Sequence, residues 1–336
     1  MRFKMTKKWR GSAGWGLTAI VTLALVASGG NYAEAKGRVF VSNEKDNTVS
    51  IIDSTQDTVV TTVAVGERPR DIKVSRDNTR LYIAQGEDDS IGILDLKQMK
   101  MVGAIGKIDD PEMFALHPDG KHLYVTNEDA GTVGKIDVTT QKVVLTIPVG
   151  VEPEGISISP DGKWICATSE SFSLIHIISH EQGKEVASIP VEPRPRECVF
   201  SQEGKFLWAS SERGASVHVI SIPEWKLLKT IDITVPLLRK EEIAPKEIEL
   251  TPDGKYAFVA LGSAKHVAVI DRSTYTVVTS ILVGARPWGM ALTPDGKKLY
   301  VANGSSNDVT VIDVEKLRAV KTMRTGRYPW TVAAEH

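Results

Sequence analysis

The sequence has no hydrophobic stretch long enough to cross a membrane as a helix. Its longest apolar run, residues 15–27, has 13 residues, whereas a bilayer requires ~20. Five basic residues lie within residues 1–10, ahead of this run, and Ala33-Glu34-Ala35 follows it. A charged start, a short apolar middle and small residues at the end are typical of a secretory signal. We predict that residues 1–35 are a signal peptide, cleaved after Ala35, and that the mature chain is periplasmic.

The mature chain also lacks an excess of positive charge. Removal of five basic residues and Glu34 leaves 36 basic and 41 acidic residues, a net charge of −5. Nucleic-acid binding depends largely on Lys and Arg that neutralise phosphates, so we exclude a nucleic-acid partner. No later segment approaches membrane length, which predicts a soluble, exported protein without a membrane span.

The common catalytic signatures are missing as well. The sequence contains neither a G-x-S-x-G elbow nor a C-x-x-C-H haem site,. No pair or trio of His, Cys and carboxylate residues has a spacing typical of metal ligands. We therefore assign no catalytic residue and no metal ligand.

What the sequence does contain is one unit repeated seven times. The turn HPDGK at 117–121 recurs as SPDGK at 159–163, SQEGK at 201–205 and TPDGK at 251–255 and 293–297. Two further columns keep the same register. A mostly aromatic column consists of Phe40, Tyr82, Tyr124, Cys166, Trp208, Phe258 and Tyr300. A column that ends an apolar strand consists of Asp53, Asp95, Asp137, Ser179, Ser221, Asp271 and Asp313. Prolines recur every 42 residues, with one gap of 50, at positions 69, 111, 153, 195, 245, 287 and 329.

Each unit is interpreted as four short strands. In the third unit these are residues 112–116, 122–127, 132–137 and 142–149, where apolar and polar residues alternate,. No segment shows a helical period with caps. The chain begins with a second strand at 38–43 and ends with a first strand at 330–334. This predicts an all-β fold, a seven-bladed β-propeller (residues 36–336) of four-stranded antiparallel blades, closed by pairing of the C-terminal strand with the N-terminal strand.

These units resemble a known repeat family. The sequence Leu123-Tyr124-Val125-Thr126-Asn127, followed by a strand ending in Asp, then Pro and SPDGK, is similar to the YVTN-type β-propeller repeat. Seven such repeats behind a signal peptide resemble the propeller family associated with catabolism that depends on pyrroloquinoline quinone (PQQ). The resemblance implies a non-catalytic periplasmic binding protein that serves quinoprotein-dependent alcohol oxidation. It also implies a quinoprotein dehydrogenase or a transporter component as partner.

The loops before strand one and after strand two are predicted to meet at one mouth of the central channel, a default place for a ligand. Blades three and four contribute carboxylates there, among them Glu112, Glu128, Glu154 and Glu170, which we interpret as a solvated acidic face. The aromatic and cationic residues of the other blades suit a flat, anionic ligand such as PQQ. The predicted ligand-binding residues are Trp288, Trp330, Arg286, Arg70, Arg68, Lys246 and Arg196.

Alternatives remain at this mouth. Its Arg and Glu side chains can instead pair with one another across the ring, and the two tryptophans can fill the channel as packing. The eight extra residues of the long unit, near 235–242, are expected at the same mouth as a lip or a partner contact, with a neutral insertion as the alternative. Cys166 and Cys198 both lie in core columns, and we expect two buried free thiols, with a disulfide as the alternative.

The leading hypothesis is therefore a monomeric binding or interaction propeller without a firmly assigned cofactor. One rival is a lactonase-like propeller enzyme, which would hydrolyse lactones through Glu112 or Glu154. The other is a generic YVTN propeller that acts as a scaffold at the cell surface.

Overall fold

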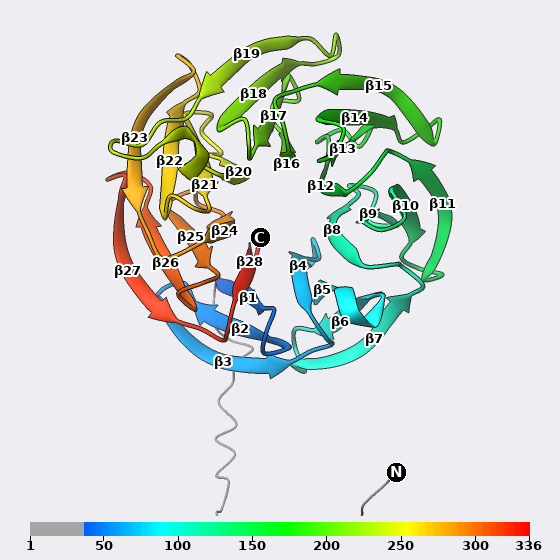
Figure 1. Cartoon of the computed structure of the whole chain (residues 1–336). Helices are drawn as coiled ribbons and strands as arrows, with labels where there is room; N and C mark the ends of the chain where they lie inside the picture. The colour runs from blue at the N-terminus through cyan, green and yellow to red at the C-terminus, as the bar shows by residue number, and fades with distance from the viewer. Residues whose placement is uncertain (1–36) are drawn as a thin grey trace, which may run out of the picture. The chain divides into compact units, whose positions relative to one another are not determined.

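The computed structural model describes residues 37–336, which form seven four-stranded antiparallel sheets arranged as blades around a central axis (Figure 1). The predicted signal peptide at residues 1–35 lies outside this range. No helix among the described residues has the length and apolarity needed to span a bilayer. The predicted seven-bladed, all-β propeller is confirmed.

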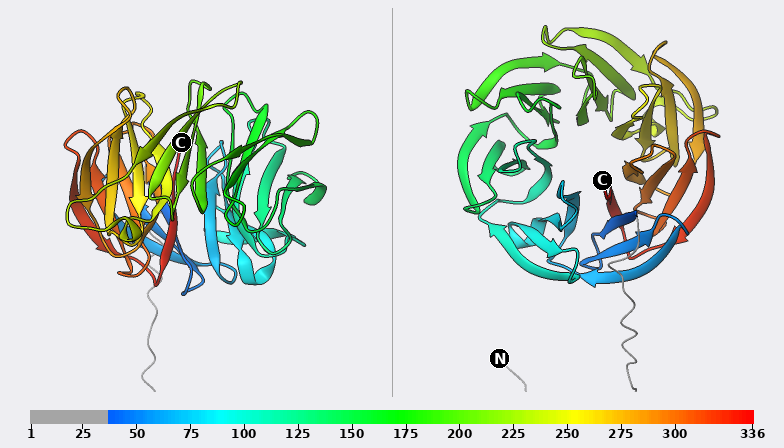
Figure 2. Two further views of the ribbon diagram at one scale, coloured as in Figure 1. Left: turned by 45° about the horizontal axis from the view of Figure 1, so that its top comes forward. Right: turned by 180° about the vertical axis from the view of Figure 1, so that it is seen from behind.

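The strands occupy four concentric positions, with the innermost strands around the axis in both face-on views (Figures 1 and 2). Each innermost strand begins at a loop proline. These strands are β28 (Pro329–Ala334), β4 (Pro69–Val74), β8 (Pro111–Leu116), β12 (Pro153–Ile158), β16 (Pro195–Phe200), β20 (Pro245–Leu250) and β24 (Pro287–Leu292). The second strands are β1 (Arg38–Asn43), β5 (Arg80–Gln85), β9 (His122–Asn127), β13 (Trp164–Ser169), β17 (Phe206–Ser211), β21 (Tyr256–Leu261) and β25 (Lys298–Asn303). The third strands are β2 (Thr48–Asp53), β6 (Ser90–Asp95), β10 (Thr132–Asp137), β14 (Leu174–Ser179), β18 (Ser216–Ser221), β22 (His266–Asp271) and β26 (Asp308–Asp313). The outer strands are β3 (Thr58–Ala64), β7 (Lys100–Gly106), β11 (Lys142–Pro148), β15 (Lys184–Pro190), β19 (Leu227–Asp232), β23 (Thr276–Leu282) and β27 (Arg318–Arg324).

Blade 1 is the sheet β28-β1-β2-β3, and blades 2 to 7 follow in chain order from β4. Two short 3₁₀ turns, η2 (Gly86–Asp88) and η3 (Lys240–Glu242), are the only helical elements among the described residues. The aromatic column of the repeat is buried in every blade, between neighbouring sheets. The blade cores therefore lie between sheets, and the innermost strands are left to surround the axis.

The repeated polar residues shape the turns. Asp53 Oδ1 accepts hydrogen bonds from the backbone N–H groups of Thr55 and Gln56, and the equivalent aspartates of other blades do the same. These bonds hold the tight connection between the third and outer strands. In the turn between strands one and two, Gly162 has φ 76°, as its place in SPDGK predicts,.

The C-terminal strand closes the ring. β28 pairs antiparallel with β1, with Val39 opposite Ala334 and Phe40 opposite Ala333. The Arg38 side chain also forms an ion pair with Glu335. The predicted split of the first blade between the two ends of the chain is confirmed.

The long unit differs from the others between β19 and β20. Val235 and Ile243 are buried in the core that blades 5 and 6 share, whereas Leu237 is fully exposed. None of residues 235–242 lines the two cavities of about 260 and 520 Å³ at the channel mouth. The insertion is thus anchored as a surface loop, and its predicted role as a lip or partner contact stays a prediction.

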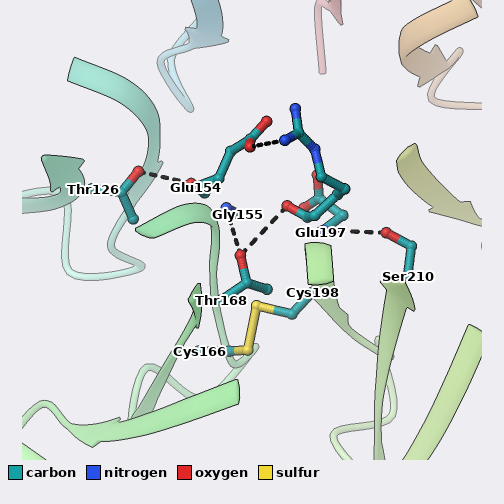
Figure 3. Close-up of a disulfide and its surroundings, with 9 residues drawn as sticks. Thr126, Glu154, Gly155, Cys166, Thr168, Glu197, Cys198 and Ser210 are labelled. Carbon is teal, nitrogen blue, oxygen red and sulfur yellow. Dashed lines mark hydrogen bonds and ion pairs between the residues drawn. A yellow bond between two sulfur atoms is a disulfide. The ribbon is translucent and has the colours of Figure 1, made fainter. Parts of the chain in front are cut away.

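The expectation of two free thiols is wrong. Cys166 on β13 and Cys198 on β16 form a disulfide between blades 4 and 5, with Cα atoms 6.5 Å apart (Figure 3),. Both residues are buried, as their columns predicted. The columns did not reveal that these two positions face each other across the junction between consecutive blades.

Deletion of residues 330–336 should destabilise the protein because it removes an inner strand and exposes the edge of β1. We expect a loss of several kcal/mol and a melting temperature lower by ~10 °C or more. A control variant that lacks only His336 should melt near the wild-type temperature. Equal melting temperatures for the full chain and the longer truncation would contradict ring closure.

The disulfide should also contribute measurably to stability. It closes a loop with a sequence separation of 32 residues, for which chain entropy alone corresponds to about 3 to 4 kcal/mol. The double variant Cys166→Ala/Cys198→Ala should therefore melt ~10 °C lower than the wild type under oxidising conditions. A strong reductant should lower the wild-type melting temperature and leave that of the variant unchanged. A wild type that contains two alkylatable thiols after unfolding without reductant would refute the bridge.

Candidate functional site

The loops that precede strand one and follow strand two meet at one end of the propeller, called here the channel mouth. In six of the seven blades, all but blade 3, the carbonyl of the residue before the loop proline accepts a hydrogen bond from the loop that follows strand two of the same blade. Examples are Gly86 N–H to Arg68 O at 3.1 Å and Gly304 N–H to Arg286 O at 2.9 Å. The predicted convergence of the two loops is confirmed.

The backbone bends sharply before these prolines. Six of the seven preceding residues have φ between 38° and 61°, namely Arg68, Asp110, Glu152, Arg194, Arg286 and Tyr328. Residues other than Gly adopt this left-handed region at a cost, and such positions concentrate at functional sites. The loop hydrogen bonds described above hold five of these six residues, all but Asp110, in that conformation.

A hydroxyl column on the second strands positions the residues that follow the prolines. Thr126 Oγ1 donates to the Glu154 carbonyl of the next blade at 2.7 Å, and Ser210 Oγ donates likewise to the Lys246 carbonyl. The Gly155 N–H donates to Thr168 Oγ1 at 2.8 Å within blade 4 (Figure 3). These hydroxyls join neighbouring inner strands where no sheet hydrogen bond does so.

Carboxylates replace the hydroxyls at two junctions. Blades 2, 6 and 7 have alanine in this column. In blades 2 and 6 a carboxylate bonds to the next blade instead: Asp71 accepts from Phe114 N–H at 3.1 Å, and Glu247 accepts from Met290 N–H at 2.9 Å. Asp71 and Glu247 each directly follow a predicted ligand-binding residue, Arg70 and Lys246. The 42-residue repeat, read one position further along each unit, identifies both residues in the sequence.

Most cations at the mouth are neutralised by a neighbouring blade. Arg70 pairs with Glu112, Arg196 pairs with Glu154 at 2.6 Å and also with Glu170, and Lys246 pairs with Glu212 at 2.6 Å. Buried ions of opposite sign require such pairing. The alternative in which Arg and Glu pair around the ring thus describes most of this network.

The acidic residues of blades 3 and 4 do not form the expected solvated face. Glu112, Glu154 and Glu170 are each less than 10% exposed and lie against arginines. Burial, and secondly the charge of Glu154, raises the pKa of the half-buried Glu128. The sequence alone did not predict that these glutamates are buried, because each arginine that covers a glutamate comes from an adjacent blade.

A cavity of about 260 Å³ opens at the mouth. Lys246 lines a neighbouring hollow instead, and Arg68 lines neither space, because its guanidinium pairs with Asp110 at 2.7 Å. Five of the seven predicted ligand-binding residues line the cavity: Arg70, Arg196, Arg286, Trp288 and Trp330.

The two tryptophans form the floor of this cavity. Their rings lie 5.7 Å apart between centroids, with Trp330 buried and Trp288 partly open. The space between them and the inner strands is about 10 Å³, room for no more than one water. The pair therefore narrows the channel, as the packing interpretation predicts, and Trp288 still faces the mouth cavity.

The neighbouring hollow, of about 520 Å³, lies over blades 5 to 7. Glu44, Glu128, Glu170 and Glu212 occupy one column after strand two, and glycine occupies it in blades 2, 6 and 7 as Gly86, Gly262 and Gly304. A side chain at Gly262 would come within 3.2 Å of Lys246 Cε. Glycine in this column thus keeps the space above Lys246 and Trp288 open. Sequence reasoning missed Glu212 and these glycines, although the 42-residue register marks their column.

Two cations of this hollow, Arg286 and Lys265, form no ion pair within residues 37–336. Arg286 is exposed, lies 4.7 Å from the Trp288 ring centroid and donates to the Tyr328 hydroxyl. Lys246 and Arg196 approach the same indole at 4.2 and 4.8 Å. The hollow therefore combines an aromatic surface with the charges of Arg286 and Lys265, which no carboxylate of residues 37–336 neutralises.

A second polar layer lies at the other end of the channel. Lys73 contacts Asp71 at 2.9 Å, and Glu197, Glu247 and Glu249 line the same cavity of about 420 Å³ as Lys73. Burial raises the pKa of Glu249 to about 7. Burial also raises the pKa of Glu197, with a contribution from the charge of Glu247, and the pKa of Glu247, with a contribution from the charge of Glu249. The floor of the mouth cavity separates this layer from the proposed ligand region.

Burial, and secondly the charge of Arg196, lowers the pKa of Lys246 to about 7. Unfolded lysine titrates near pH ~10.4, so between pH 7 and 10 the unfolded chain binds more protons at this residue than the folded one. Stability linked to Lys246 therefore rises with pH across that window.

We expect the unfolding free energy of the wild type, relative to that of Lys246→Met, to increase from pH 7 to pH 10 in urea titrations. Lys265→Met controls for the loss of a lysine at this mouth. A difference between wild type and Lys246→Met that stays constant over this range would contradict the lowered pKa.

Comparison with known proteins agrees with this architecture. The family model described as lactonase, 7-bladed beta-propeller matches residues 156–324, just over half of the chain. The chain belongs to this family of seven-bladed propellers. A YNCE-like beta-propeller model matches residues 7–125. No curated protein sequence matches the chain.

Solved structures are similar over most of this lactonase-family propeller. Hydrazine synthase of Kuenenia stuttgartiensis is 26% identical with a TM-score of 0.71, covering 79% of this chain and 89% of that one. Dihydro-heme d1 dehydrogenase NirN is 18% identical with a TM-score of 0.66, covering 88% and 74%. A functionally unknown protein from Desulfotomaculum acetoxidans is 17% identical with a TM-score of 0.77, covering 90% and 99%. The latter two likenesses concern the fold alone.

Proposed function

We propose that this protein is a non-catalytic periplasmic binding propeller whose ligand is a planar, anionic aromatic molecule. The ligand lies in the hollow over blades 5 to 7, with one face on Trp288 and its carboxylates toward Arg286 and Lys265. PQQ, a planar tricarboxylate, has this chemistry. The protein then serves quinoprotein-dependent alcohol oxidation, with a quinoprotein dehydrogenase or a transporter component as partner.

The observation that carries the proposal is Arg286, a cation on an indole face beside an open hollow. The other arginines near the floor are matched by glutamates, so an incoming anion would have to compete with Glu112 for Arg70 or with Glu154 for Arg196. At Arg286 it displaces no carboxylate of residues 37–336. A hydrogen bond to a charged group contributes ~1.5–3 kcal/mol and a stacked aromatic ring ~0.5–1.5 kcal/mol beyond burial of its area.

The size of the hollow also supports the proposal. Its volume of about 520 Å³ falls within the ~300–1,000 Å³ typical of small-molecule sites. The glycines after strand two of blades 6 and 7 leave this side of the mouth open, whereas glutamates fill the same column in blades 3 to 5. A flat ligand can therefore reach the exposed part of Trp288 without moving a side chain of that column.

A second candidate function, lactone hydrolysis, is favoured by one observation. Lys246, with its pKa near 7, can act as a general base at neutral pH,, and it lies beside Glu212 in the same hollow. This candidate agrees with the family to which the chain belongs. It requires turnover, which the binding proposal does not.

Titration with PQQ while tryptophan fluorescence is followed tests the binding proposal. We expect quenching beyond the inner-filter effect, with affinity reduced ~10–100-fold in Arg286→Ala and at least ~10-fold in Trp288→Ala. Arg327→Ala is the matched control, because this exposed cation of the mouth pairs with Asp46 and lines neither cavity. Unchanged affinity in both site variants would reject the proposed site.

The same purified protein distinguishes the second candidate. Hydrolysis of sugar lactones, phosphorylated or not, that is lost in Lys246→Met would favour an enzyme. PQQ binding without lactone turnover would favour the binding function.

A further inference from the structure

Three histidines and an aspartate meet on the face opposite the channel mouth, away from the proposed ligand hollow. His117 and Asp119 lie in the turn between β8 and β9, His122 is the first residue of β9, and His180 follows β14 in the next blade. One potential ligand atom from each of the four side chains lies within 4.8 Å of all the others. The cluster thus spans the junction between blades 3 and 4.

The donor atoms already approach the spacing of a metal site. Asp119 Oδ2 lies 2.6 Å from His122 Nδ1 and 3.1 Å from His117 Nδ1. Ligands at ~2.0–2.1 Å from a tetrahedral zinc ion are separated by roughly 3.3 Å. The rings of His117 and His180 are stacked, 3.9 Å apart between centroids. They must therefore tilt apart for the nitrogens of both rings to face one ion, a side-chain movement with no change of the backbone.

Hydrogen bonds at the far sides of two rings orient them toward the common centre. His117 Nε2 donates to the Gly162 carbonyl at 2.8 Å, so Nδ1 is the potential ligand atom. Nδ1 accepts a long hydrogen bond, 3.2 Å, from the Asp119 backbone N–H, which a bound ion would replace. His180 Nδ1 lies 2.8 Å from the Tyr124 hydroxyl, which leaves Nε2. Metal-binding histidines usually have an outer partner of this kind, because it fixes the tautomer and the ring orientation.

The carboxylate is held in the same way. Asp119 Oδ1 accepts hydrogen bonds from the backbone N–H groups of Lys121 and His122. The other oxygen, Oδ2, is directed at the imidazoles of His117 and His122. The turn thus presents to the cluster one carboxylate oxygen, Oδ2, whose partners are imidazole nitrogens.

The internal repeat provides an independent argument. At the position of His117, five other blades have Ser or Thr, whose hydroxyl accepts a hydrogen bond from the N–H five residues later: Ser75, Ser159, Ser201, Thr251 and Thr293. Histidine at this position gives up that bond. Among residues 37–336, the columns of His122 and His180 contain histidine in no other blade. Three separate columns of the repeat thus contain histidine in a single blade each, and the three histidine side chains lie next to one another.

We propose that His117, Asp119, His122 and His180 bind a divalent transition-metal ion, with zinc as the best match. Three imidazoles and one carboxylate complete a tetrahedral zinc site, and imidazole ligands suit zinc better than magnesium or calcium. His117 and His122 also line a cavity of about 640 Å³ on this face, through which an ion reaches the cluster. The bound ion joins blades 3 and 4, beside the junction that the disulfide joins.

Calorimetric titration of the metal-free protein, prepared without a polyhistidine tag, with zinc chloride tests the site. We expect one zinc ion per chain and a higher melting temperature with zinc. His122→Ala/His180→Ala should reduce the affinity at least ~100-fold, and Tyr124→Phe, which removes only the outer hydrogen bond, should reduce it ~10-fold. His266→Ala, a matched loss of one histidine outside the cluster, should bind zinc like the wild type.

Cobalt provides a readout that does not depend on whether a variant folds. Cobalt(II) added to the metal-free wild type should give the intense visible absorption bands of tetrahedral coordination, and zinc should abolish them. Absence of stoichiometric zinc binding by the wild type, or equal affinity in the double variant, would overturn the proposal. Weak octahedral cobalt bands alone would overturn it as well.

Discussion

The closed ring of inner strands is the constraint on which the chemistry of this propeller depends. Because β28 completes the first blade, seven equivalent residues that follow prolines converge on one mouth. Charged side chains brought together in this way must be neutralised by their neighbours. The pairs of Arg70 with Glu112, Arg196 with Glu154 and Lys246 with Glu212 meet that requirement across blade junctions.

Departures from the repeat then stand out as candidates for function. Glycine replaces glutamate after strand two in blades 6 and 7, which leaves a hollow beside Trp288 and the unmatched Arg286. Histidine replaces a hydroxyl residue in the turn of blade 3, which assembles the cluster on the opposite face. In both places the fold is the same as in the other blades, and only the side chains differ.

The sequence predicted the strands well because their register repeats within each blade. β9 and β10 begin and end at the predicted residues, and the first strand of blade 3 begins one residue earlier than predicted. Contacts between blades were not predictable from the same pattern. The 42-residue repeat does not predict that Cys166 faces Cys198 or that Arg70 pairs with Glu112. Nor does it predict that His180 approaches the turn of the preceding blade. These contacts depend on the rotation between sheets, which no single repeat encodes.

The most direct test of the account is a crystal structure of the protein grown with saturating PQQ. The account predicts one ligand in the hollow over blades 5 to 7, with its ring plane on Trp288 and a carboxylate within hydrogen-bond distance of Arg286. A ligand against the glutamates of blades 3 and 4 or at the opposite end of the channel, or an empty hollow at saturation, would contradict it.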